Sequence, residues 1–155
     1  MEIEERERAI ASSELAKGLS PAFVRKLAEI AQWRKIPRGG RIVEEFDESF
    51  DLLLLVSGEG RVMTVTDEMI TTIRPGMPIG EISFFDRRPR AAGVVAVEDS
   101  LVLTFPEHDL RALTRAEPGQ AILALNNLAR VLCGRLRRAN QQIAALLAVE
   151  ESREI

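Results

Sequence analysis

Residues 80–96, GEISFFDRRPRAAGVVA, hold the polar side chains best suited to binding a ligand. Glu81 and Arg90 lie in this segment together with the small residues Gly80, Ala91 and Ala92. A guanidinium meets an anion in a bidentate geometry that an ammonium cannot match, and a carboxylate accepts hydrogen bonds from hydroxyl groups. Small side chains leave the backbone N–H groups open to an anion. The segment therefore predicts a site for a small anion that also carries hydroxyl groups.

A cyclic phosphodiester joined to a ribose has both kinds of group. We expect Arg90 to meet the phosphate and Glu81 to accept from the free sugar hydroxyl. Ile82 and Ser83 are expected to begin a short helical turn whose N–H groups face the ligand. The alternative is that Glu81 and Arg90 only pair with each other across the loop. A surface ion pair of that kind contributes ~0–1 kcal/mol, which is a weak reason for such a segment.

The residues on both sides of this segment, from 41 to 105, read as short strands separated by turns. Turn-forming residues stand at 57–60, 67–68 and 74–76. The strands are predicted at 42–43, 50–56, 61–66, 69–73, 93–97 and 101–105. Short strands with regular turns predict a sandwich or a jelly roll.

Helices are predicted on either side of the strands. A charged helix is expected over residues 2–17, and Ser20 followed by Pro21 marks the start of a second helix that ends near Trp33. After a break at 35–40 and the strands, helices are predicted at 107–115 and from about 120 to about 150. The predicted fold class is α+β, a β-jelly-roll (cupin-like double-stranded β-helix) flanked by N-terminal helices and a long C-terminal helix. Its parts are residues 1–35, 36–105 with the ligand segment at 79–92, and 106–155.

The long helix has a heptad pattern of apolar residues. Their spacing alternates between three and four residues in the series Ile122, Leu125, Ala129, Leu132, Leu136, Ala139, Ile143 and Leu146. Such a repeat keeps one apolar edge against a partner helix and predicts a homodimer through this helix. The alternative is a helix packed only on its own domain. Arg130, Arg135, Arg137 and Arg138 are predicted to form a solvated face.

Composition excludes several classes of protein. The chain has 155 residues, a net charge of −3 and a pI near 5.4, so it has no electrostatic footprint for direct nucleic-acid binding. Cys133 and His108 are the only cysteine and histidine, which argues against disulfides, thiolate metal sites, a haem sensor and a jelly-roll metalloenzyme. No apolar run approaches ~20 residues and no secretory signal is present, so we expect a cytoplasmic protein without membrane contact.

The ligand segment, taken as IGEISFFDRRPRAAGVVA, resembles the phosphate-binding cassette of cyclic nucleotide-binding domains. It is most similar to the cassettes of protein kinase A regulatory subunits and cyclic-nucleotide-gated channels, and it also resembles the catabolite activator protein family. The stretches LSPAFVRKLAEIAQWRKIPRGGRIV, FDLLLLVSGEGRVMTV and IRPGMPIGE are similar to that family's N-terminal helix, hairpin and approach to the cassette. The resemblance covers about residues 15 to 147.

The resemblance implies a role for each matching position. Arg90 would pair with the cyclic phosphate, and Glu81 would accept from the ribose 2′-hydroxyl. The implied phosphate cradle is made by Gly80 and by amides near Ile82, Ser83, Ala91 and Ala92. Val62, Ile70 and Ile73 would line the base and sugar, and Asn140 on the C-terminal helix would reach a purine edge. Gly93 stands where the family often has a threonine. A hydroxyl near this position often favours guanine in the family, so its absence favours cAMP over cGMP.

We therefore expect a sensor without catalysis, whose ligand is a cyclic nucleotide and which needs no metal or other cofactor. Ligand would repack the C-terminal helix and change contacts with an effector protein that remains unknown. One alternative is a degenerate domain that binds no ligand and acts as a protein-interaction module. Another is a cyclic-nucleotide-responsive transcription regulator. Such a regulator carries a helix-turn-helix after its long helix, and AVEESREI after Leu147 is too short to form one, so this reading requires a trimmed chain.

Overall fold

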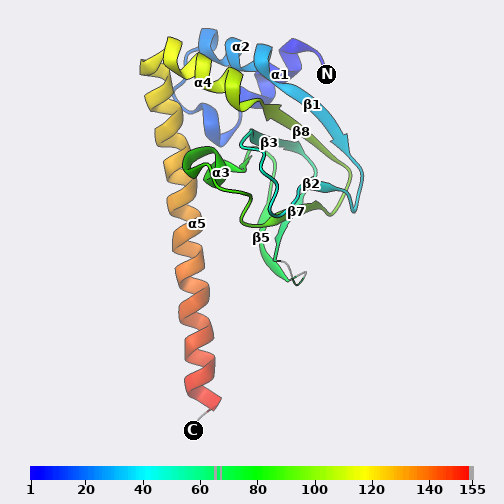
Figure 1. The fold of residues 1–155 in the computed structure, drawn as a ribbon, viewed down its shortest axis with the longest axis vertical. Coiled ribbons are helices and arrows are strands. Elements are labelled where there is room, and N and C mark those ends of the chain that lie inside the picture. The colour runs from blue at the N-terminus through cyan, green and yellow to red at the C-terminus, as the bar shows by residue number, and fades with distance from the viewer. Residues whose placement is uncertain (65, 67, 154–155) are drawn as a thin grey trace.

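The computed structural model of the 155-residue chain describes residues 1–64, 66 and 68–153. It consists of a β-roll with helices at one end and one long helix along its side (Figure 1). The predicted jelly-roll class with flanking helices is confirmed. Part of the predicted turn at 67–68 lies outside the described residues.

The β-roll consists of two four-stranded antiparallel sheets. The strands of the first, in spatial order, are β1 (Gln32–Ile36), β8 (Ser100–Phe105), β3 (Leu52–Ser57) and β6 (Pro78–Ile79). Those of the second are β2 (Arg41–Val43), β7 (Gly93–Ala96), β4 (Gly60–Met63) and β5 (Met69–Ile73). β1 corrects the prediction that a helix runs to Trp33 and is followed by a break. All five of its residues pair with β8, and this pairing outweighs the local helical pattern.

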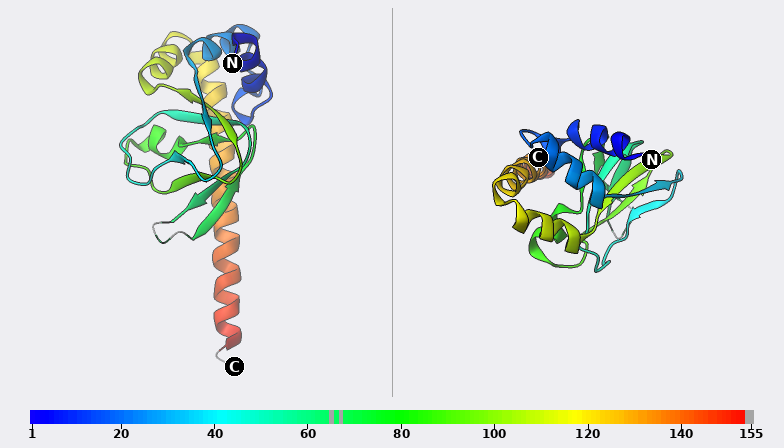
Figure 2. Two further views of the ribbon diagram at one scale, coloured as in Figure 1. Left: turned by 90° about the vertical axis from the view of Figure 1, so that its right-hand side faces the viewer. Right: turned by 90° about the horizontal axis from the view of Figure 1, so that it is seen from above.

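Helices cover one end of the roll (Figure 2). They are α1 (Ile3–Ala11), the 3₁₀ helix η1 (Glu14–Ala16), α2 (Pro21–Ile30) and α4 (Glu107–Ala116). The Ser20 hydroxyl accepts from the Phe23 N–H at 3.1 Å, which confirms the predicted start of α2. The single charged helix expected over 2–17 is instead divided between α1 and η1.

Strand β3 separates two apolar cores. Leu52 and Leu54 face the helices, whereas Leu53 and Leu55 face the interior of the roll. Successive side chains of a strand point to opposite faces, so a strand buried on both faces must be apolar throughout. This accounts for the unbroken run Leu52–Leu55 in the sequence.

Two helices frame the ligand segment. The short helix α3 (Glu81–Asp86) follows β6, and α5 (Pro118–Arg153) passes beside it and continues well beyond the roll (Figure 1). α5 is anchored near its start, where the buried Asn127 amide donates to the carbonyls of Leu15 and Lys17 at 2.8 Å. Much of the heptad seam is exposed: Ile122 by 59%, Leu136 by 63% and Leu146 by 67%.

Candidate functional site

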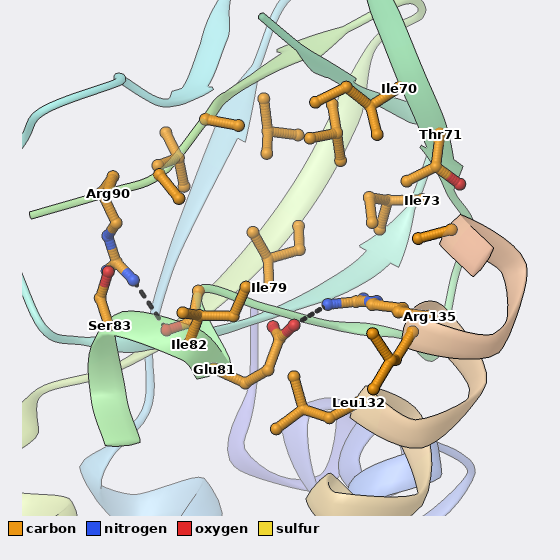
Figure 3. Close-up of a pocket in the computed structure, with 18 of the residues that line it drawn as sticks. Ile70, Thr71, Ile73, Ile79, Glu81, Ile82, Ser83, Arg90, Leu132 and Arg135 are labelled. Carbon is orange, nitrogen blue, oxygen red and sulfur yellow. Dashed lines mark hydrogen bonds and ion pairs between the residues drawn. The ribbon is translucent and has the colours of Figure 1, made fainter. Parts of the chain in front are cut away.

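A cavity of about 530 Å³ lies between the β-roll, α3 and α5 (Figure 3). Every residue predicted for the site except Asn140 lines it: Val62, Ile70, Ile73, Gly80, Glu81, Ile82, Ser83, Arg90, Ala91 and Ala92. Asn140 is exposed, and the neighbouring α5 residues Arg138, Ala139 and Gln142 line the cavity in its place. The position of Asn140 therefore differs from the predicted one, because the helix turns its side chain away from this chain's own cavity.

Gly80 allows the backbone to pass close to the arginine of the site. It has a left-handed conformation, with φ of 82°, and forms the N-cap of α3. A Cβ at this position would collide with the Arg90 guanidinium. The backbone angle therefore favours glycine, and a larger residue would have to displace the guanidinium.

Arg90 is a buried cation held by backbone carbonyls. Its side chain donates to the Gly80 carbonyl at 2.8 Å and to the Asp51 carbonyl at 2.6 Å, and only 3% of the residue is exposed. Burial lowers the pKa of the guanidinium, while the charges of Asp47, Asp51 and Glu81 act in the opposite direction. Its Nε is buried without a hydrogen-bond partner among the described residues. A buried positive charge with spare donor capacity suits an anion.

Glu81 pairs with Arg135, not with Arg90. Arg135 donates to Oε1 of Glu81 (Figure 3) and, at 2.6 Å, to the Pro78 carbonyl. Glu81 is 2% exposed, and its Oε2 is buried with no partner among the described residues. The prediction that Arg135 lies on a solvated face is wrong, since its side chain is only 19% exposed. Arg135 follows the buried Leu128 by seven residues, a signal that places both on one helix face.

The remaining walls of the cavity are mostly apolar. Val43, Val94, Val62 and Thr71 are aligned across the four strands of the second sheet, so their side chains share the inner face. Leu132, Leu136 and Ala139 cover the cavity from α5. The Gln142 amide donates to the Ile70 carbonyl at 3.5 Å and so joins α5 to β5. Thr71, Leu132 and Gln142 line the cavity although none of them was predicted as a site residue.

Helix α4 braces the outer side of α3. Arg111 donates to the Phe84 carbonyl at 2.6 Å, and its guanidinium lies 4.5 Å from the centroid of the Phe84 ring. Glu107 accepts from Arg111 at 2.8 Å and from Arg87, and these contacts, the Arg111 hydrogen bond above all, lower its pKa. Arg87 thus has a carboxylate partner, although its own side chain is 58% exposed.

The site can bind an anion with hydroxyl groups beside an apolar moiety. The charged groups that could meet such a ligand come from the cassette and from α5. Within the described ranges, no group of three or more histidine, cysteine, aspartate or glutamate side chains is arranged to hold a metal ion. None of the helices there combines the length and apolar character needed to span a bilayer.

The antiparallel roll, the cassette helix and the long covering helix define a class of ligand-binding regulatory domain. Residues 33–117 match the cyclic nucleotide-binding domain family, and the chain belongs to that family.

Several known proteins are similar over most of the chain. The cyclic AMP receptor protein of Thermus thermophilus is 34% identical over 145 residues, which cover 91% of this chain and 65% of that protein. The structure of the catabolite activator protein from the same organism matches 86% of this chain and 63% of its own, with 33% identity and a TM-score of 0.71. A cyclic nucleotide-binding domain from Methylobacillus flagellatus KT matches 92% of this chain and 82% of its own, with 27% identity and a TM-score of 0.79. The chain thus spans about two thirds of the length of the Thermus proteins.

Proposed function

We propose that this domain binds cAMP in the cavity and, without catalysing a reaction, passes the signal to an effector protein. The proposal rests on one observation: the Glu81 carboxylate and the Arg90 guanidinium are both buried, and both line a mostly apolar cavity. Arg90 and Glu81 each retain one buried polar atom without a protein partner. The volume of about 530 Å³ falls in the ~300–1,000 Å³ range of small-molecule sites.

Arg90 would bind the cyclic phosphate. Its guanidinium is held by the carbonyls of Gly80 and Asp51, so the cation needs no reorganisation when the anion arrives. No carboxylate lies within 4.0 Å of it among the described residues, which leaves its charge available. Amides near Ile82, Ser83, Ala91 and Ala92 would complete the cradle.

Glu81 would accept the ribose 2′-hydroxyl through Oε2. Because Arg135 occupies Oε1, it orients the carboxylate and leaves the second oxygen for the ligand. Arg135 is therefore proposed as a positioning residue. It also connects the cassette to α5, so a ligand that shifts Glu81 would shift the helix.

The base would lie between the apolar strands and α5. Val62, Ile70 and Ile73 line this part of the cavity, and Ala139 and Gln142 approach from the helix. Two observations favour adenine: the relative named as a cyclic AMP receptor protein, and Gly93, which supplies no side-chain hydroxyl.

We further propose a homodimer through the exposed seam of α5. In a parallel pair of helices, residues on the flanks of the seam meet flanking residues of the partner. Asn140 lies on the flank opposite Arg135 and would then approach the partner's Arg135. The predicted contact of Asn140 with the purine would be made across the dimer.

A domain that binds no nucleotide is the second candidate, and one observation favours it. The ion pair between Glu81 and Arg135 already joins the cassette to α5 without a ligand. In that case the domain would act only by protein contacts.

Isothermal titration with cAMP and cGMP distinguishes the two candidates. We expect saturable binding with cAMP preferred, and at least a ~10-fold loss of affinity in Arg90→Lys because a lysine cannot reproduce the forked contacts. Arg88→Lys is the matched control, since Arg88 is an exposed arginine of the same loop. No binding of either nucleotide to the native chain would support the ligand-free domain.

A further inference from the structure

The segment that runs from β1 to β2 is a basic strip on an acidic protein. Residues 32–43, QWRKIPRGGRIV, contain four cations and no carboxylate, although the chain carries a net charge of −3. The four cations are Arg34, Lys35, Arg38 and Arg41, and all are exposed. None has an ion pair within 4.0 Å among the described residues. Asp99 accepts from the backbone N–H of Arg38 and not from its side chain.

β1 and β2 belong to different sheets, and each lies at the end of its sheet. β1 pairs only with β8 and β2 only with β7, so each has one side without a strand neighbour in the described chain (Figure 1). An edge strand exposes backbone N–H and C=O groups that can pair with another chain. Arg34 reaches across to the Ile42 carbonyl at 2.6 Å and holds the two edges near each other.

A polar cleft of about 500 Å³ lies along these edges. Arg34 and Arg41 line it, and so do Glu44, Asp47 and Asp51. Trp33, which is 43% exposed, also lines the cleft. The cleft adjoins the nucleotide cavity, because Val43 and Arg90 line both.

We propose that an extended acidic segment of a partner protein binds along the β1 edge. Its backbone would continue the sheet, and its carboxylates would meet Arg34, Lys35, Arg38 and Arg41. Successive side chains of β1 alternate between faces, so Arg34 and Lys35 point to opposite faces, and carboxylates at consecutive positions of the segment would meet both. A second copy of this edge is disfavoured because cations of the two strips would repel each other.

A nucleic acid is a less suitable partner for the strip. The loop that follows β2 carries five carboxylates within residues 44–51: Glu44, Glu45, Asp47, Glu48 and Asp51. They would repel a continuous row of phosphates, whereas a peptide can place neutral residues opposite them. The free backbone groups of the edge likewise match a peptide strand and not a phosphate backbone.

The proposal is tested with the full chain and the peptide acetyl-(Glu-Glu-Val)₃-amide, which carries carboxylates on both faces of a strand, in the absence of cyclic nucleotide. We expect saturable binding by NMR titration, with amide shift changes concentrated in residues 32–43. The double substitution Arg34→Glu/Arg41→Glu should weaken binding at least ~10-fold. Arg74→Glu/Arg115→Glu is the matched control, because it makes the same charge change at two exposed arginines outside the strip.

Further variants separate the parts of the proposal. Because Arg34 also donates to the Ile42 carbonyl, its substitution could disturb the fold. Lys35→Glu/Arg38→Glu leaves that hydrogen bond in place and serves as a second double variant, for which we expect the same loss of binding. A peptide N-methylated at every second residue should bind at least ~10-fold more weakly, since it cannot pair with the edge. Equal losses in the control double variant, equal binding of the N-methylated peptide, or tighter binding of an oligo-dT of equal charge would each overturn the proposal.

Discussion

At the scale of single residues, Gly80 can be compared with Gly18. Both have a left-handed backbone, with φ of 82° and 78°, but only at Gly80 would a Cβ meet Arg90, whereas nothing lies near Gly18. We expect Gly18→Ala to lower the free energy of unfolding by ~1–2 kcal/mol through backbone strain alone. Gly80→Ala should cost more and also abolish tight nucleotide binding. Denaturant unfolding and titration calorimetry measure the two effects, and equal costs would contradict the close approach of Arg90.

The ion pair between Glu81 and Arg135 can be examined by a double-mutant cycle. Arg135→Met leaves a carboxylate buried without its partner, so we expect a loss of roughly 2–3 kcal/mol in the free energy of unfolding, reduced because Arg135 is partly exposed. Glu81→Gln in the same chain should recover much of that loss. Denaturant unfolding at neutral pH measures all four chains. Additive effects would show that the two side chains do not act as a pair.

At the scale of secondary-structure elements, Glu107 connects α4 to α3 through Arg111 and Arg87. Because the pKa of Glu107 is lowered in the folded protein, its stabilising contribution is present above its ordinary pKa of 4.5. The contribution is lost as the pH falls through the lower folded value. We expect Glu107→Gln to destabilise the domain at pH 7 and to flatten the acid side of its stability profile. Thermal unfolding between pH 3 and pH 7 measures both, and Glu151→Gln on the exposed end of α5 is the control.

At the scale of the whole molecule, the exposed seam of α5 predicts a dimer. We expect light scattering to give twice the chain mass of 17.2 kDa. Ile143→Glu/Leu146→Glu should produce monomers, because it places four carboxylates in the shared seam. Ala144→Glu/Ala148→Glu adds the same charge to the same segment outside the seam and should leave the mass unchanged. A monomeric native chain at high concentration would contradict the dimer.

Local patterns were enough to predict several elements. The span of β5, Met69–Ile73, agrees with the prediction, and the start of α2 follows from Ser20 and Pro21. In each case the signal lies within a few residues, as alternation of side chains or a helix cap. β1 could not be predicted in this way because its conformation depends on pairing with β8, nearly seventy residues away.

The kind of fold could be predicted from the short strands and regular turns. The residue types of the cassette could also be recognised in the sequence, because a glycine, a carboxylate, an arginine and small residues lie close together in the chain. The pairing of Glu81 with Arg135 and the contacts of Arg90 with Gly80 and Asp51 depend on the tertiary structure. It also decided which side of α5 covers the cavity, and so turned Asn140 outward. The physical reason is that these contacts depend on the rotation and docking of a long helix, which residue types and spacing leave open.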